Sequence, residues 1–199
     1  MTEREDAVAA YFSRSVEALG KAAADRDLLA TTRAIADAVT GALRGGGKVL
    51  IAGNGGSAAD AQHIATELLS RFARERRSLP AIALTDPVVL TAIGNDYGFA
   101  HVFERQVRGL GRRGDVLLAI STSGRSPNVL AALEAAREVG LMTIGLTGTQ
   151  GTALRALCDL CLVAPSDETA VIQQIYMTAA HAVCAVVERD LAEPVSPGA

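Results

Sequence analysis

Five short apolar segments, each followed by a stretch with helical periodicity, constrain the fold of this chain more than any other feature. These segments are rich in Val, Ile and Leu, and they cover residues 48–53, 81–84, 115–120, 142–148 and 160–164. Strands that are buried on both faces have this continuous apolar character, and strands that alternate with helices form parallel sheets. The sequence therefore predicts an α/β fold with a five-stranded parallel sheet flanked by helices on both faces.

Apolar residues at helical spacing predict the helices around this sheet. They cover residues 57–74, 88–95, 100–110, 128–139, 152–157 and 168–191. Two more helices, at about 6–19 and 28–43, are predicted to form an N-terminal hairpin that ends at the glycine run 45–47. The pattern indicates one domain over residues 1–199, with a core at about 8–190 and a flexible tail at 192–199.

Composition and charge exclude several classes of function. Apolar residues make up 49% of the 199 residues and the formal net charge is −3, so we expect neither a disordered chain nor a nucleic-acid-binding protein. The N-terminal segment lacks the apolar region of a signal peptide, and no uninterrupted apolar run reaches about 18 residues. These features predict a cytoplasmic protein with no membrane partner.

Two further patterns have structural interpretations. The basic run at 71–77 is interpreted as a solvated helix end, with contact to an anionic partner as the alternative. The chain has three cysteines, and Cys158 and Cys161 lie in or beside a predicted strand, where we expect them to pack in the core. An odd number of cysteines argues against a disulfide framework.

Two loops at predicted strand ends have the composition of an anion-binding site, and ligands of such sheets bind at the carboxyl ends of the strands. The first, GNGGS at 53–57, combines glycines that let the backbone approach an anion with Ser57 as a predicted N-cap. The second, STSGRS at 121–126, carries four hydroxyl groups just before Pro127. An ordinary glycine turn and a solvated serine loop are the alternatives, and Arg125 could add a cation or point into solvent. Together the loops predict a phosphate site.

Three segments resemble a known family: GNGGSAADAQH at 53–63, STSGRSPN at 121–128 and SDETAVIQ at 166–173. They are similar to the sugar isomerase (SIS) domain and, more narrowly, to the phosphoheptose isomerases, also called sedoheptulose 7-phosphate isomerases. The resemblance extends over about residues 8–190. It implies a single SIS domain, a homotetramer with active sites shared between subunits, and a role in heptose biosynthesis. The implied reaction is the isomerisation of sedoheptulose 7-phosphate to D-glycero-D-manno-heptose 7-phosphate through an enediol.

Aldose–ketose isomerisation needs a base for a carbon-bound proton and an acid for the carbonyl oxygen. His63 and Glu67 are four residues apart on a predicted helix and so share one face, although the residues alone are also compatible with a surface pair. By the same reasoning His181, in an apolar stretch, could be a packed core histidine. The resemblance implies that Glu67 and His181 are the catalytic pair.

The resemblance also implies a zinc site formed by His63, Glu67, Gln173 and His181. Gln173 and His181 are eight residues apart, which separates their Cα atoms by about 12 Å on a continuous helix. Long side chains, a helix irregularity or a contribution from another subunit would have to close that gap. A metal-free mechanism with the same Glu and His is the alternative.

The substrate-binding residues are likewise implied by the resemblance. Ser57 and the hydroxyls of 121–126 are expected to hold the 7-phosphate, and Asn54 and Asp96 to bind sugar hydroxyls, with helix capping as the alternative for Asp96. The full set is Asn54, Gly55, Gly56, Ser57, Glu67, Asp96, Ser121, Thr122, Ser123, Ser126 and Gln173. His101 matches no catalytic residue, and we expect a surface or packing role for it.

Four positions depart from the family pattern. Arg125 replaces a usual Asn, and Val171, Gln174 and Tyr176 replace a usual Arg, Glu and His. These changes leave substrate identity and metal occupancy open. The alternative function is a non-catalytic SIS adaptor, such as a DnaA-binding replication-initiation regulator, which is expected to lack Glu67 and His181. A sugar-phosphate-sensing regulator would need an attached DNA-binding domain.

Overall fold

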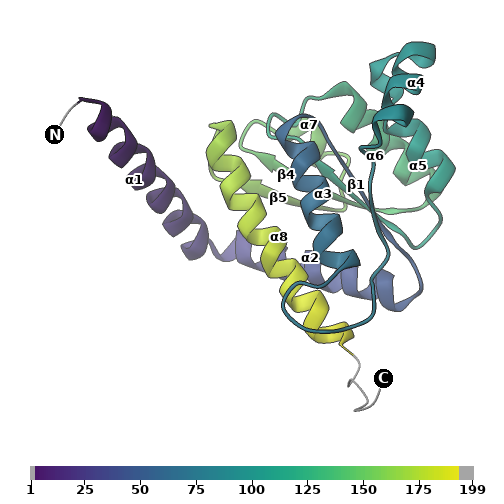
Figure 1. Cartoon of the computed structure of the whole chain (residues 1–199), viewed down its shortest axis with the longest axis horizontal. Coiled ribbons are helices and arrows are strands. Elements are labelled where there is room, and N and C mark those ends of the chain that lie inside the picture. Colours follow the sequence, from purple (N-terminus) through teal and green to yellow (C-terminus); the bar gives the residue numbers. More distant parts are fainter. Residues whose placement is uncertain (1–2, 193–199) are drawn as a thin grey trace.

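The computed structural model of the chain describes residues 3–192, which form a five-stranded parallel sheet between two layers of helices (Figure 1). The strands are β1 (Val49–Gly53), β2 (Ala81–Ala83), β3 (Val116–Ile120), β4 (Met142–Gly148) and β5 (Leu160–Ala164). They are hydrogen-bonded in the order β2-β1-β3-β4-β5, and every pairing is parallel. The predicted α/β sheet is confirmed, with each strand boundary within one residue of its predicted position.

Helices occupy all of the predicted segments. They are α1 (Glu3–Ala24), α2 (Arg26–Arg44), α3 (Gly56–Leu69), α4 (Pro87–Tyr97), α5 (Glu104–Leu110), α6 (Pro127–Val139), α7 (Thr152–Arg155) and α8 (Thr169–Leu191), with a 3-10 turn, η1 (Phe99–His101), before α5. The predicted helix at 100–110 is therefore divided into η1 and α5. Of the tail predicted at 192–199, all but Ala192 lies outside the described residues.

Each strand contributes to two separate hydrophobic layers, because successive side chains of a strand point to opposite faces of the sheet. Val49 and Ile51 of β1 pack with α2, α3 and α8 on one face. Leu50 and Ala52 pack with α5 and α6 on the other. This double burial explains why the strands read as continuous apolar runs rather than as alternating ones.

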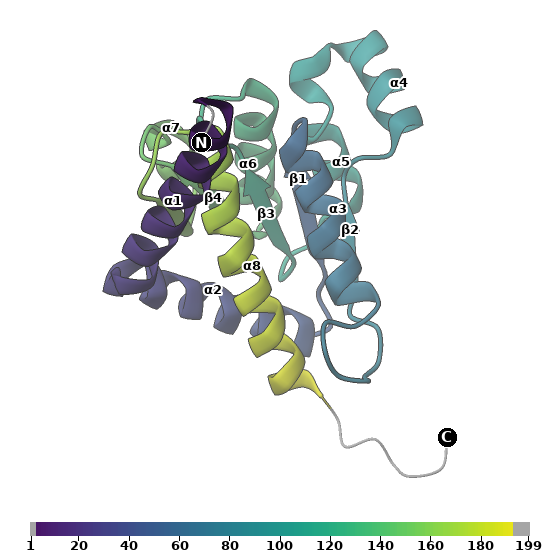
Figure 2. The same ribbon diagram turned by 60° about the vertical axis from the view of Figure 1, so that its left-hand side comes forward.

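The N-terminal and C-terminal helices pack differently against this body. Asp25 caps α2 by accepting hydrogen bonds from the backbone N–H groups of Asp27 and Leu28, and α2 then crosses α8 and packs against it (Figure 2). Helix α1 projects away from the body (Figure 1). Helix α8 is long and apolar enough to cross a membrane, but its buried residues, such as Ile172 and Tyr176, belong to the core of the domain.

The predicted helix over 57–74 is wrong at its C-terminal end, because α3 stops at Leu69 and residues 70–80 form a loop. The Glu188 carboxylate, on α8, accepts hydrogen bonds from the backbone N–H groups of residues 72–74, which therefore cannot continue the helix. The solvated interpretation of the basic run also fails for Arg76, whose side chain is buried beside Glu188. It holds for Arg71, which is exposed.

The strand order brings the two predicted binding loops together. After β1 the chain moves outward to β2 and then returns to β3 on the other side of β1, so β1 and β3 are neighbours. Such a reversal opens a crevice at the carboxyl ends of the two central strands, where ligands of doubly wound sheets bind. The loops at 53–57 and 121–126 lie at that point.

Candidate active site

The two loops at the strand ends are joined by a pair of amide side chains. Asn54 and Asn128 donate to each other's side-chain oxygens, and both hydrogen bonds measure 2.9 Å. Gly55, with a φ of 55°, adopts the left-handed conformation that favours glycine and turns the first loop into α3. The amide of Asn54 therefore links the two loops to each other. Its contact with a sugar hydroxyl stays a prediction.

The second loop presents hydroxyl groups at the start of α6. Ser121 Oγ lies 3.1 Å from Ser126 Oγ and accepts a 3.1 Å hydrogen bond from the backbone N–H of Gly124. Ser123 Oγ accepts from the backbone N–H of Arg125, whose side chain is exposed. Hydroxyl donors beside a helix N-terminus, where backbone N–H groups also point outward, suit a phosphate group.

The prediction that Ser57 is an N-cap is wrong, because α3 begins at Gly56 with Gly55 at the cap position and no side-chain cap hydrogen bond. The Ser57 side chain instead contacts Tyr176 on α8. Its Oγ lies 3.1 Å from the Tyr176 hydroxyl, which donates a 2.5 Å hydrogen bond to the Asp60 carboxylate. Burial and the neighbouring Asp60 carboxylate raise the pKa of Tyr176, so the phenol stays protonated at neutral pH. Since that single proton goes to Asp60, the phenol oxygen is left as an acceptor for the Ser57 hydroxyl.

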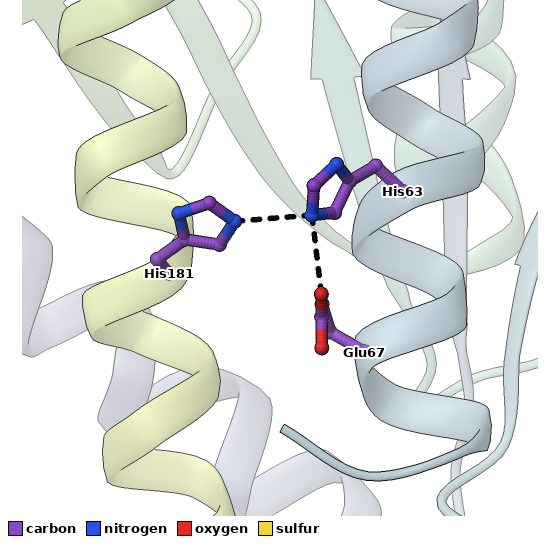
Figure 3. A group of neighbouring side chains, drawn as sticks. All are labelled: His63, Glu67 and His181. Atoms are coloured by element: carbon purple, nitrogen blue, oxygen red, sulfur yellow. Dashed lines mark hydrogen bonds and ion pairs between the residues drawn. The ribbon is translucent and has the colours of Figure 1, made fainter. Parts of the chain in front are cut away.

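Three of the predicted site residues converge between α3 and α8 (Figure 3). His63 Nε2 lies 3.1 Å from Glu67 Oε1 and 3.1 Å from His181 Nε2. The His63 side chain is 47% exposed and that of Glu67 is 22% exposed, so a ligand can reach the cluster from solvent. His63 and Glu67 share a face of α3 as predicted, and the fold brings His181 to them from a position 118 residues later in the chain.

The cluster has the chemistry of a zinc site. Its three donor atoms lie within 4.8 Å of one another, and imidazole nitrogens with a carboxylate oxygen are ligands that zinc accepts. Bond lengths of about 2.0–2.1 Å in a tetrahedral shell separate neighbouring ligand atoms by about 3.3 Å, close to the two contacts of 3.1 Å. The fourth predicted ligand, Gln173, lies two turns before His181 on α8 with its amide against Gly56, so the structure does not bring it into the cluster of three.

Two other predicted assignments fall elsewhere. Asp96 lies on α4, where it accepts a hydrogen bond from the Asn95 amide and lines a surface cavity with Tyr97 and Arg105. Among residues 3–192, no hydrogen bond joins it to the cluster. His101 is on the surface, as expected, with its Nδ1 2.6 Å from the Glu104 carboxylate.

The cysteine pair packs as expected. Cys158 and Cys161 are partly buried beside Gly145 and pack against the hydrophobic layer that contains α5 and α6. Cys158 Sγ donates a hydrogen bond to the Leu154 carbonyl oxygen. The two thiols are free, and they lie on β5 and the turn before it, away from the loops of the site.

Sequence reasoning missed four residues that support the site. Asn128 and Asp60 bind residues of the two loops, and Arg76 and Glu188 form the buried ion pair behind α3. One signal was available for Glu188, because a carboxylate at the two-turn spacing from His181 on a largely apolar helix needs a buried partner. Asn128 lies in the segment STSGRSPN, but nothing in the sequence indicates that its side chain pairs with Asn54.

Comparison with known proteins places the chain among isomerases. The SIS domain profile matches residues 11–148. A protein named phosphoheptose isomerase from Bradyrhizobium sp. (strain ORS 278) is 59% identical over 193 residues, which cover 96% of this chain and 98% of that protein. Solved structures agree: phosphoheptose isomerase GmhA from Neisseria gonorrhoeae superimposes with a TM-score of 0.87 at 44% identity, covering 93% of this chain and 98% of that one. A phosphoheptose isomerase from Francisella tularensis has the same TM-score at 41% identity, covering 95% and 100%.

Proposed function

The chain belongs to the phosphoheptose isomerase family of SIS-domain proteins and is an isomerase, and we propose that it converts sedoheptulose 7-phosphate into D-glycero-D-manno-heptose 7-phosphate in the cytoplasm. The observation that carries this proposal is the convergence of Glu67 and His181 from α3 and α8 beside two loops suited to phosphate. A binding protein needs the loops alone, so the cluster favours an enzyme over the non-catalytic adaptor.

The phosphate loops hold one end of the substrate. Hydroxyls of Ser121, Thr122, Ser123 and Ser126 and the N-terminus of α6 bind the 7-phosphate. Helix α3 begins in the first loop, and its rise of 1.5 Å per residue places His63 about 10 Å from Gly56 along the axis. The carbon chain of a heptose spans from the phosphate on C7 towards the cluster, which fixes the reacting carbons against it.

Glu67 then moves the proton between carbons. Its carboxylate removes a proton from C1 of the ketose, the electrons of that C–H bond form the enediol, and the same carboxyl returns the proton to C2. His181 donates a proton to the C2 oxygen and accepts the proton of the C1 hydroxyl, so the carbonyl moves to C1. The proton count is unchanged over the cycle.

A zinc ion is proposed as a cofactor of this site. His63, Glu67 and His181 would hold it, and Gln173, whose amide lies against Gly56, would be the fourth ligand only if a neighbouring subunit supplied it. A zinc ion on Nε2 of His181 would polarise the substrate oxygen in place of the proton that His181 otherwise donates, and the free oxygen of Glu67 would remain the base. The donor types and the separations within the cluster support this assignment.

A homotetramer with shared active sites is proposed as the working assembly. The support is an exposed apolar face on α1, formed by Val8, Phe12 and Val16, which are 57%, 69% and 69% exposed. These residues are spaced by four and so lie on one face of the helix. The position of Asp96 on α4, away from the cluster, is compatible with a role at the site of a neighbouring subunit.

Isomerisation of sedoheptulose 7-phosphate by the purified protein tests the function. Glu67→Gln and His181→Ala are each expected to lower kcat by at least about 100-fold, because each removes a proton-transfer group. His101→Ala and Glu75→Gln are matched controls at exposed positions, and both should retain wild-type rates. Each protein is assayed with and without a chelator, and after zinc is added back.

The outcomes separate the parts of the proposal. Loss of activity in both variants, with the controls active, establishes the acid–base pair. Activity that disappears with chelator and returns with zinc supports the metal, whereas an unaffected rate overturns it. A folded wild-type protein without turnover under any of these conditions would overturn the proposed substrate.

A further inference from the structure

A buried ion pair lies behind the cluster. Arg76 Nε is 3.2 Å from Glu188 Oε2, and the two side chains are only 1% and 2% exposed. Removing two charges from water costs free energy that their attraction offsets only in part, so a buried pair is a weak source of stability. Its contacts point to another role.

Arg76 caps the end of α3. Its Nη2 donates a 2.7 Å hydrogen bond to the Glu67 carbonyl oxygen, and its Nη1 donates to the carbonyl oxygens of Leu68 and Ser70. The last carbonyl groups of a helix have no partner within it, and a cation at that end is favourable. Glu67 is the third residue from the end of α3, in the turn where helices fray.

Glu188 holds the loop that follows α3. Its two carboxylate oxygens accept from the backbone N–H groups of Phe72, Ala73 and Arg74 at 2.7–2.8 Å. Burial favours the neutral acid, yet these donors and Arg76 outweigh it and hold the pKa of Glu188 below its usual range. The carboxylate is therefore charged at neutral pH and keeps the loop against the lower part of α8 (Figure 1).

The loop returns to the cluster through Phe72. The ring of Phe72 lies 5.7 Å from that of His181, measured between centroids. Glu188 is seven residues after His181 on α8, so both side chains lie on the same side of the helix. The ion pair therefore binds the backbone of two segments next to the cluster: the helix turn that carries Glu67, and Phe72, whose ring lies beside His181.

We propose that the Arg76–Glu188 pair positions the catalytic groups of this enzyme by fixing the last turn of α3 and the loop that carries Phe72. The inference rests on the proposed roles of Glu67 and His181. Within residues 3–192 no hydrogen bond joins either residue of the pair to the loops at 53–57 and 121–126, so loss of the pair should act on the chemical step rather than on substrate binding.

Steady-state kinetics of full-length variants with sedoheptulose 7-phosphate provide the first test. Arg76→Met and Glu188→Gln are expected to lower kcat by about 10- to 100-fold, the size of effect that a displacement of about 1 Å produces, with KM changed less than about twofold. Arg76→Lys should be intermediate, because an ammonium lacks the planar fork that reaches several acceptors. Arg71→Met and Glu75→Gln are the matched controls, since they remove an exposed pair from the same segment.

Hydrogen exchange, measured by mass spectrometry, is the second test and does not depend on activity. The proposal predicts that exchange in Arg76→Met and Glu188→Gln rises locally, over residues 66–74, while the rest of the domain keeps the wild-type pattern. A uniform rise over the whole chain, or wild-type kcat in both variants, would overturn the positioning role. If Arg76→Met does not fold, the kinetics and exchange of Glu188→Gln alone test the positioning role. Glutamine has nearly the same shape as glutamate and keeps one oxygen that can accept from the loop.

The two proposals fail in different ways. A wild-type protein without turnover would overturn the proposed function, and the exchange measurement would then decide whether the pair holds the turn that carries Glu67. An active wild type whose Arg76 and Glu188 variants match the controls in kcat would overturn the positioning role alone.

Discussion

Tyr176 lies on α8 beside the loop at 53–57, at a position where the family pattern has a histidine. Its hydroxyl joins two side chains of α3, Ser57 and Asp60, and it is fully buried. The hydroxyl of Ser57 donates to the phenol oxygen, so in this arrangement Ser57 can accept a further hydrogen bond but has no proton for a phosphate oxygen. The replacement of histidine by tyrosine thus sets the direction of one hydrogen bond at the site.

Tyr176→Phe tests this arrangement. Removing the hydroxyl leaves the Asp60 carboxylate without its donor, and we expect the free energy of unfolding to fall by about 1–3 kcal/mol. We also expect KM to rise by about fivefold, because Ser57 is no longer held in one orientation; this corresponds to about 1 kcal/mol of binding. Urea unfolding and steady-state kinetics measure the two effects.

The control is Tyr11→Phe, which removes the same atom from an exposed position on α1. Tyr176→His, which restores the residue usual in the family, should recover most of the wild-type KM. An unchanged KM in Tyr176→Phe would show that Ser57 is oriented without the phenol.

At the scale of the element, the loop between β3 and α6 depends on one close approach of two backbones. Gly124 has a φ of 61°, and a Cβ there would lie 2.3 Å from the Cα of Gly151. No side chain can occupy that space unless one backbone moves, because contacts between Cβ atoms and backbone are never this short. The loop at 121–126 and the residue before α7 therefore approach each other through two glycines, Gly124 and Gly151.

Gly124→Ala is expected to displace the loop and weaken substrate binding. The left-handed conformation costs an alanine about 1–2 kcal/mol, and the contact with Gly151 adds to that cost. KM should rise by about 10-fold or more, in line with a loss of about 1.4 kcal/mol of binding free energy, while kcat at saturation changes less. Kinetics and urea unfolding measure these changes.

Gly41→Ala is the matched control for that substitution. Gly41 is inside α2, and within the described part of the chain a Cβ there meets no atom within 4 Å. This variant should be more stable than wild type by about 0.5–1 kcal/mol, with KM unchanged. A wild-type KM in Gly124→Ala would argue against a phosphate-binding role for the loop.

At the scale of the whole molecule, the exposed face of α1 supports the proposed tetramer. Phe12→Ser removes the largest side chain of that face, and the lost burial of one phenylalanine costs about 1.5–3 kcal/mol per copy. We therefore expect the tetramer of this variant to dissociate at a concentration at least about 10-fold higher than wild type. Light scattering coupled to size-exclusion chromatography, over a dilution series, measures the assembly.

Lys21→Ser, at a position of α1 where the side chain is 66% exposed and paired with Glu17, is the control. Activity that falls together with the tetramer in Phe12→Ser would support active sites shared between subunits. A wild-type protein that is monomeric and fully active would overturn both the tetramer and the sharing.

The sheet and the two binding loops could be predicted from the sequence because their signals are local. A doubly buried strand reads as an apolar run, a helix repeats with a period of 3.6 residues, and both loops follow directly from a strand. The pairing of His63 with Glu67 has the same origin, since a spacing of four residues fixes their shared face. The family resemblance rested on these same contiguous segments.

Contacts between distant parts of the chain were decided by the tertiary structure alone. His181 approaches His63 only because α8 and α3 pack side by side on one face of the sheet. The end of α3 was predicted too late because helical periodicity continues past Leu69, whereas Glu188, more than 100 residues away, binds the backbone that would have extended it. Periodicity assigns each side chain to a face of its own helix, but which buried charge it meets there depends on how the helices pack.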